Sequence, residues 1–363
     1  MKISNFVRLC TTLAFRVLFR NREVKTPVDA DSVRKILVLR YDVIGDMVVT
    51  TPLLQFLKSR LPDAEIHVVG SKKNIGVLRC NPNVKKVYRY DYSVGSLLRI
   101  ARECRKERYN LALAVVFHKT TKSGLWANLC GGKYAVKVTN LHVGRAKLYR
   151  SMFNVLIPLR PNSCTMAEAL IQLASAALGV EYTKKDIEFF IPYDEHSALR
   201  AKELTDNIPE NSRIFVNISA GVPERTWPVA TWHSFLEQLH NSYPELHFFV
   251  SGSPDAAGDI CRVTNELGEQ FIPVPPSADI LDTCAVVDRC FAVISPDTSI
   301  IHIASAYSKP TLGIYASAHF NTLFAPYFEP NLVVVSERGQ PISEMPVGNV
   351  IQGFAQLWEI ISK

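Results

Sequence analysis

The sequence has no long apolar run and no closely paired cysteines. No stretch of the 363 residues approaches the roughly 20 apolar residues that a membrane-spanning helix needs. The eight cysteines include no CxxC pair, and only Cys284 and Cys290 lie near each other. We interpret them as reduced thiols of a cytoplasmic protein.

The glycine fingerprints of two large enzyme classes are also missing. Neither GxGxxG nor GxxxxGKS/T occurs after an apolar run, which argues against a dinucleotide dehydrogenase and a P-loop enzyme. HExxH and GxSxG are absent as well. The net charge of +7 is modest, and long Lys/Arg blocks with interleaved aromatic residues are lacking. This pattern favours a phosphorylated lipid or sugar, not nucleic acid, as partner.

The sequence does contain a repeated alternation of apolar runs and helical patterns, which is typical of an α/β fold with a parallel sheet. The length favours two domains. A helical segment, 165–179, and a polar, proline-marked stretch, Pro192–Asn211, separate two series of runs. The first series spans 35–40, 65–70, 84–90 and 111–117, and the second spans 213–219, 246–252, 291–297, 310–315 and 331–336. We therefore expect two similar doubly wound domains, followed by an amphipathic helix over 347–361.

The N-terminal residues 1–30 read as a basic amphipathic helix. An apolar stripe comprises Phe6, Leu9, Leu13 and Val17, with arginines beside it. A helix of this kind lies in the headgroup layer of an anionic membrane, or packs against its own domain. A signal peptide is a further alternative, but a convincing small-residue cleavage site is lacking.

The loop after the first apolar run carries two carboxylates, Asp42 and Asp46. In open α/β sheets, ligands bind beyond the carboxyl ends of the strands. Gly45 allows a tight turn, and a helix start beside Asp46 would hold its carboxylate ionised. Asp46 then either takes a proton from a substrate hydroxyl or only caps the helix, and Asp42 is the local rival for both roles.

The loops of the second series suit a diphosphate. The SerAlaGly run Ser219, Ala220 and Gly221 offers backbone N–H groups, and Arg225 supplies a cation with several donors. Four further candidates are Asp297 for sugar hydroxyls, Thr298 and Ser299 for phosphate, and Asp255 for a ribose hydroxyl pair. His302 follows in the same helix as Ser299. The alternatives are a solvated Arg225, a plain N-cap at 297–299 with a core histidine, and an Asp255 that only starts a helix.

Three segments, taken together in order and spacing, resemble one enzyme family. They are RYDVIGDMVVTTPLL, NISAGVPERTWP and ISPDTSIIHIASAYSKPTLGIY, and the family is the lipopolysaccharide heptosyltransferases of glycosyltransferase family nine. The resemblance implies a GT-B fold, with two Rossmann-like domains facing a central cleft. It places the acceptor in residues 31–192 and the nucleotide-sugar donor in residues 193–340. It also allows the C-terminal helix, within 341–363, to pack back on the first domain.

Carried over to this chain, the resemblance makes Asp46 the catalytic base. Arg225 stands where the family has a phosphate-binding lysine, and Ser299 replaces the glycine of an aspartate-threonine-glycine motif. AlaSerAla at 316–318 replaces a glycine-proline-threonine turn. Residues expected on the acceptor side are Arg40, Asp42, Gly45, Lys72, Lys73, His118 and Lys119.

The activity implied is an inverting sugar transfer that needs no metal and no cofactor. ADP-heptose is the expected donor, and a lipopolysaccharide core or another anionic glycolipid is the expected acceptor. The enzyme would then be peripheral on the cytoplasmic face of the inner membrane. Alternatives are a transferase for another nucleotide sugar and a degenerate homologue that binds without turnover. An epimerase or dehydrogenase is disfavoured, because the glycine fingerprint is missing.

Overall fold

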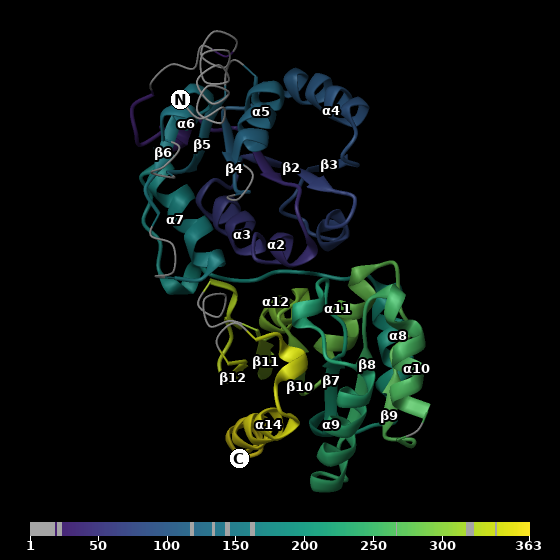
Figure 1. Cartoon of the computed structure of the whole chain (residues 1–363). Coiled ribbons are helices and arrows are strands. Elements are labelled where there is room, and N and C mark those ends of the chain that lie inside the picture. The colour runs from purple at the N-terminus through teal and green to yellow at the C-terminus, as the bar shows by residue number, and fades with distance from the viewer. Residues whose placement is uncertain are drawn as a thin grey trace, which may run out of the picture. The chain divides into compact units, whose positions relative to one another are not determined.

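A computed structural model describes residues 19, 24–116, 120–132, 135–141, 146–159, 164–265, 267–316, 323–337 and 340–363. The chain divides into two compact units. The first comprises residues 1–161 and 166–190, and the second comprises residues 162–165 and 191–363. Both are α/β units, coloured purple to teal and teal to yellow in Figure 1. Each is described by itself below.

The first unit contains a six-stranded parallel sheet in the order β3-β2-β1-β4-β5-β6. The strands are β1 Lys35–Arg40, β2 Glu65–Ser71, β3 Lys86–Tyr90, β4 Leu111–Ala114, β5 Val136–Asn140 and β6 Val155–Ile157. The strand order reverses at β1, which pairs with β2 on one side and β4 on the other. This switch point is where doubly wound sheets bind ligands, at the carboxyl end of the strands.

Helices cover both faces of this sheet. The row α4 Val94–Glu107, α5 Thr120–Gly131 and α6 Ala146–Met152 packs together on one face, and α3 Thr51–Arg60 packs with α7 Met166–Leu178 on the other (Figure 1). The short helix α2 Ile44–Val48 directly precedes α3. Because both faces are covered, the interior of β1 is apolar, and Ile36–Leu39 are fully buried.

The second unit repeats the plan with the order β12-β11-β10-β7-β8-β9. Its strands are β7 Arg213–Asn217, β8 His247–Ser251, β9 Phe271–Pro273, β10 Ala292–Pro296, β11 Thr311–Tyr315 and β12 Asn331–Val335. Its helices are α8 Glu195–Thr205, α9 Val229–Ser242, α10 Ala257–Asn265, α11 Ile280–Asp288, α12 Ser299–Ala306 and α14 Val347–Ile361. The equivalent switch lies at β7, between β8 and β10.

The C-terminal helix α14, for which we had allowed packing on the first domain, contacts β11, β12 and α9 of the second unit. Val350, Phe354 and Leu357 are fully buried there. At Gly353 an added Cβ would lie 2.7 Å from Val334 and 3.2 Å from Leu312. Glycine therefore lets α14 rest directly on the sheet.

The doubly wound α/β prediction is confirmed, with differences in detail. All nine expected runs contain a strand, but β5, β6 and β9 were not predicted; β6 and β9 have only three residues each. The polar stretch 192–211 lies between the two series of strands, as expected, and contains helix α8, which was not predicted. The buried residues of α8 are Ser197, Ala201 and Thr205, so it lacks the apolar stripe that predicts a helix.

The proposed N-terminal stripe of Phe6, Leu9, Leu13 and Val17 lies outside the described residues. Within the described part of the chain, no helix combines the length and the apolar character that crossing a bilayer requires.

Candidate active site

The carboxyl end of β1 holds a buried arginine between two carboxylates. Arg40 is 1% exposed. Its Nη1 lies 3.3 Å from Oδ2 of Asp42, and its Nη2 lies 3.3 Å from Oδ1 of Asp46. Arg40 also donates to two backbone carbonyls, those of Asp46 and Val115. One guanidinium, that of Arg40, thus fixes both acids of the loop and ties them to the residue directly after β4.

Neighbouring polar side chains brace the same loop. The Ser71 hydroxyl donates to the backbone carbonyl of Asp42 at 2.8 Å, and Asn74 Nδ2 donates to that of Arg40 at 3.0 Å. Asn74 Oδ1 in turn accepts from the backbone N–H of Ser71 at 2.8 Å. Ser71 is the last residue of β2, the neighbour of β1, Asn74 follows three residues later, and both are fully buried. Hydrogen bonds from Ser71 and Asn74 therefore stabilise the loop conformation in addition to those from Arg40.

The two carboxylates differ in environment. Asp42 has a side chain that is 5% exposed, and its Oδ1 has no hydrogen-bond partner among the described residues. Burial, opposed by the Arg40 charge and reinforced by Asp46, raises the pKa of Asp42 to about 6. The Asp46 side chain is 12% exposed and faces the same guanidinium. Of the pair, Asp46 is thus the more accessible to a substrate.

The structure does not give Asp46 a capping role. Helix α2 begins after Val43 with no side-chain cap, and Asp46 lies in its first turn with its carboxylate on Arg40. Gly45 was expected in a tight turn, but it has helical backbone inside α2 and no positive φ. The alternative that Asp46 only caps the helix is therefore wrong. Its carboxylate remains available to a substrate.

Among the other residues predicted on the acceptor side, Lys72 and Lys73 are exposed and follow β2. Gly70 of β2 pairs with Arg40 of β1, so both lysines share a sheet edge with the carboxylates. His118 and Lys119 lie outside the described residues.

In the second unit, a buried asparagine joins the two loops at the switch point. Asn217, the last residue of β7, is 4% exposed. Its Nδ2 donates to the carbonyl of Ser219 at 2.9 Å and lies 3.1 Å from the hydroxyls of Ser295 and Thr298. Sequence reasoning missed Asn217 and Ser295. The sequence signal that could have found Asn217 is a polar residue at the end of a buried strand, because packing alone favours an apolar residue there.

The predicted cation and acid of the donor side are brought together. Arg225 Nη1 lies 3.0 Å from Oδ2 of Asp297 and donates to its carbonyl at 3.2 Å. The Arg225 side chain is 31% exposed, so the solvated-residue alternative is not supported, while the Asp297 side chain is 8% exposed. Burial raises the pKa of the Asp297 carboxyl, and Arg225 opposes the rise.

Helix α12 starts next to this pair. Thr298 is its N-cap and accepts from the N–H of Ile300, Ser299 is its first residue, and His302 is 5% exposed. The His302 ring lies 6.0 Å from that of Phe324. The N-cap alternative for Thr298 is therefore correct, and capping leaves the positive end of the helix dipole at this edge.

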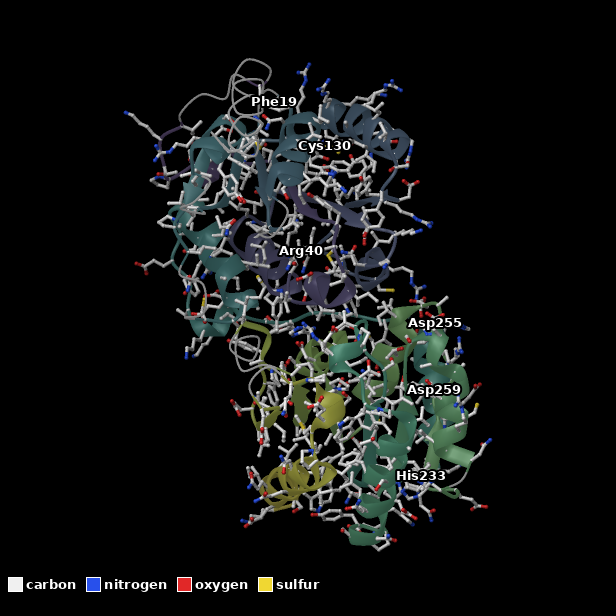
Figure 2. The ribbon with its side chains drawn as sticks, viewed as in Figure 1. Phe19, Arg40, Cys130, His233, Asp255 and Asp259 are labelled. Carbon is white, nitrogen blue, oxygen red and sulfur yellow. The ribbon has the colours of Figure 1, made fainter. Side chains whose placement is uncertain are left out.

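The remaining donor residues line the neighbouring loops. The Ser219 hydroxyl accepts from the N–H of Ser253 at 2.7 Å and so links the loops after β7 and β8. Gly221 is exposed, and a Cβ there would meet nothing within 4 Å. Asp255 is exposed in a single turn, Pro254–Ala256, before α10 (Figure 2). Ser219, Arg225, Asp255 and Asp297 thus follow β7, β8 and β10, which are adjacent in the sheet.

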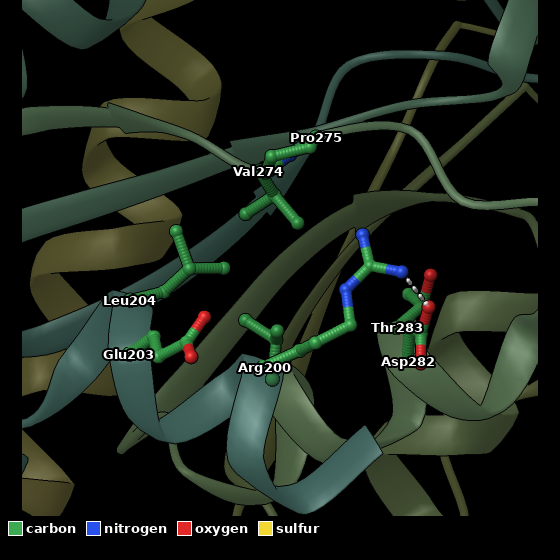
Figure 3. A pocket seen from close by; sticks show the side chains of 8 residues that line it. Arg200, Glu203, Leu204, Val274, Pro275, Asp282 and Thr283 are labelled. Carbon is green, nitrogen blue, oxygen red and sulfur yellow. Dashed lines mark hydrogen bonds and ion pairs between the residues drawn. The ribbon is translucent and has the colours of Figure 1, made fainter. Parts of the chain in front are cut away.

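A separate pocket lies between α8, α11 and the chain after β9 (Figure 3). Arg200, Glu203 and Asp282 line it, with the ion pair between Arg200 and Asp282 at 2.7 Å. None of the predicted site residues lines this pocket. Within the described residues, no group of three or more His, Cys, Asp or Glu side chains is placed to hold a metal ion.

Comparison with known proteins decides the family. The model of "Glycosyltransferase family 9 (heptosyltransferase)" matches residues 98–346. The chain belongs to this family. The loop with Asp46 precedes the matched range. The "Lipopolysaccharide heptosyltransferase 1" of Campylobacter coli is 20% identical over 319 residues, covering 85% of this chain and 91% of the relative.

Solved structures share the fold of this family 9 glycosyltransferase. A family 9 glycosyltransferase from Veillonella parvula has a TM-score of 0.77 at 18% identity, covering 93% of this chain and all of that one. An Escherichia coli heptosyltransferase with ADP-2-deoxy-2-fluoro heptose has a TM-score of 0.71 at 16% identity, covering 89% and 99%. The expected GT-B fold is confirmed.

Proposed function

We propose that this glycosyltransferase transfers heptose from ADP-heptose to a lipopolysaccharide core acceptor, with inversion and without a metal. Family membership supports the sugar transfer. The names of relatives support the acceptor class, and the ligand of the Escherichia coli structure supports the donor. The observation that carries the proposal is Asp46, an accessible carboxylate held by a buried arginine at the switch point of the first sheet.

In the proposed reaction, Asp46 accepts the proton of an acceptor hydroxyl. The hydroxyl oxygen attacks the anomeric carbon while the bond from that carbon to the diphosphate breaks, and the electron pair leaves with ADP. Attack opposite the leaving group inverts the anomeric centre. Because the guanidinium of Arg40 keeps Asp46 in place, the base is oriented before the acceptor arrives.

The second unit would stabilise the leaving group. Arg225 supplies a cation, and the N-terminus of α12 supplies backbone N–H groups next to Thr298 and Ser299. Asp297 would hold Arg225 in place through their 3.0 Å ion pair. In this proposal Asp255 binds the ribose hydroxyls. The first unit would accordingly bind the acceptor and the second the donor.

A direct test follows the reaction by mass spectrometry. Purified enzyme is incubated with ADP-heptose and with a heptose-deficient lipopolysaccharide core, in buffer containing EDTA. We expect the acceptor mass to rise by one heptose residue, and NMR of the product to show the anomeric configuration opposite to that of the donor. Transfer that requires an added divalent cation, or that retains the configuration, would contradict the mechanism.

Two alternatives are resolved by the same assay. A transferase for another nucleotide sugar would release its nucleotide from that donor and leave ADP-heptose intact. A degenerate homologue would bind ADP, raising its apparent stability by mass action, without forming product from any donor. We favour an active enzyme because the carboxylates of Asp46 and Asp297 both retain their arginine partners.

A further inference from the structure

The first unit contains a lysine that rests on three tyrosine rings. Nζ of Lys122, on α5, lies 4.7 Å from the ring centre of Tyr90, 5.4 Å from that of Tyr92 and 5.5 Å from that of Tyr41. Tyr41 directly follows β1, and Tyr90 ends β3. The cluster therefore lies on the sheet edge that carries Asp42 and Asp46.

Packing holds this cluster rigidly. Tyr41 and Tyr90 are 2% and 3% exposed, and their ring centres lie 5.8 and 4.8 Å from that of the buried Trp126. The Tyr41 hydroxyl is within 3.0 Å of the Ser123 hydroxyl. The ammonium of Lys122 thus lies over aromatic rings whose positions are fixed by packing.

The charge of Lys122 is not neutralised within the described part of the chain. Its contacts there are the three ring faces, and no carboxylate lies within ion-pair distance. Lys86 provides the contrast: it lies 4.7 Å from the ring centre of Tyr88, and it also pairs with Glu107 at 3.3 Å. Two acids are adjacent in sequence to these rings: Asp91 accepts from the N–H of Ser93, and Asp42 pairs with Arg40.

Tyr92 combines an unfavourable backbone conformation with an exposed side chain. Its φ is 72°, a left-handed value that residues other than glycine rarely adopt. Its side chain is nevertheless 43% exposed, and its hydroxyl donates to the carbonyl of Tyr41 at 3.4 Å. Backbone strain of this kind gathers at ligand sites, where the surroundings enforce it. An exposed ring therefore flanks an ammonium that has no anion.

We propose that Lys122 and Tyr92 bind an anionic sugar of the acceptor, with the ammonium on its carboxylate or phosphate and the ring against its apolar face. The inference rests on the proposed function, because it takes the first unit as the acceptor side. A lysine ammonium binds either anion as a point charge, so the site is specific for charge and for a sugar face.

The test is a binding titration of the full-length enzyme, followed by ligand-observed NMR. The probes are glucuronate, glucose 6-phosphate and uncharged glucose. We expect one or both anionic sugars to bind and glucose not to bind, and the preferred anion separates a carboxylate from a phosphate source. Lys122→Gln should weaken this binding about tenfold or more, since a hydrogen bond to a charged group is lost. Tyr92→Ala should weaken it too.

Matched variants keep the result interpretable. Lys86→Gln removes a lysine that also lies over a tyrosine but is already paired, so anionic sugars should bind it as they bind wild type. Lys122→Arg keeps the charge and should retain binding, which separates loss of charge from loss of fold. Absence of binding to wild type, or equal binding by Lys122→Gln, would overturn the proposal. An ADP titration of the same variants reports on the donor site alone, so a failure of the donor assignment is seen separately.

Discussion

Asp42 and Asp46 are bound to the same guanidinium, each at 3.3 Å from a different terminal nitrogen of Arg40. Two acids thus share one cation, and the more buried of them has the raised pKa. From the sequence we expected the two aspartates to be separable, with Asp46 as base and Asp42 as a neighbour of small effect. In the structure, a change at either acid alters the electrostatic environment of the other.

Replacing the proposed base gives the first prediction. Asp46→Asn keeps the shape but cannot accept the proton, so turnover should fall by about 10²–10⁴, the usual contribution of a general base. ADP affinity should barely change, because Arg225 and Asp297 belong to the other unit. Turnover is measured by ADP release. Near-normal turnover, or a larger loss in Asp42→Asn, would remove Asp46 from the catalytic role.

The second prediction concerns stability against pH. The pKa of Asp42 rises from about 3.8 unfolded to about 6 folded, so the folded state binds more protons between these values. Its contribution to the free energy of unfolding therefore decreases as pH rises from about 4 to 6, by up to about 3 kcal/mol. Asp42→Asn lacks this contribution.

Urea unfolding of wild type and Asp42→Asn across this pH range tests the second prediction. The variant should gain stability relative to wild type as pH rises to 6, and the difference should level off above it. The titrating groups that do not interact with Asp42 are common to both proteins and cancel in the difference. A constant difference across the range would show that Asp42 is not buried as described.

Removing the shared cation gives the third prediction. Arg40→Met leaves two acids without their partner in a buried site, which should lower the free energy of unfolding by about 3–5 kcal/mol at pH 8. The control is Arg99→Met, because the Arg99 side chain is 58% exposed and pairs with Glu103 at 3.6 Å. That change should cost less than about 1 kcal/mol. Similar values from chemical denaturation of both variants would contradict a structural role for Arg40.

The donor side gives the fourth prediction. Arg225→Ala should weaken ADP binding about tenfold or more, because a hydrogen bond from a charged group to phosphate is worth about 1.5–3 kcal/mol. Arg262→Ala, on α10, removes an arginine that is 70% exposed and pairs with Asp259, and should leave ADP binding unchanged. Isothermal titration calorimetry compares the two. Unchanged ADP affinity in Arg225→Ala would exclude this residue from the donor site.

The fifth prediction concerns the membrane. Deleting residues 1–25 should leave a folded enzyme that no longer sediments with anionic liposomes, if the stripe of Phe6, Leu9, Leu13 and Val17 attaches it. The cut must stop there, because Pro27 packs against Gly179 and Val28 donates to the carbonyl of Ala177. An insoluble or unfolded product would instead assign the helix to the domain core.

Nine of the described strands were predictable from sequence, because buried parallel strands form nearly continuous apolar runs, as in Lys35–Arg40. Helix α8 was not, because its buried face is small and polar. The family motifs located Asp46, Arg225 and Asp297 in sequence. They did not indicate that Arg40 serves two acids, although these lie only 2 and 6 residues away. Nor did they indicate that Asn217 joins two loops, since side-chain partners 81 residues apart, such as Asn217 and Thr298, leave no local pattern.

The packing of α14 on β11 and β12 also affects the order in which the two units can fold during synthesis. The first unit ends at Phe190 and has its strands and helices before the second is synthesised. The second unit must wait for its final helix, because Phe354 and Leu357 fill its core. A nascent chain released before residue 347 would expose the apolar surface of β11 and β12 to solvent. Residues 347–363 therefore decide whether the second unit completes its core or leaves this apolar surface exposed.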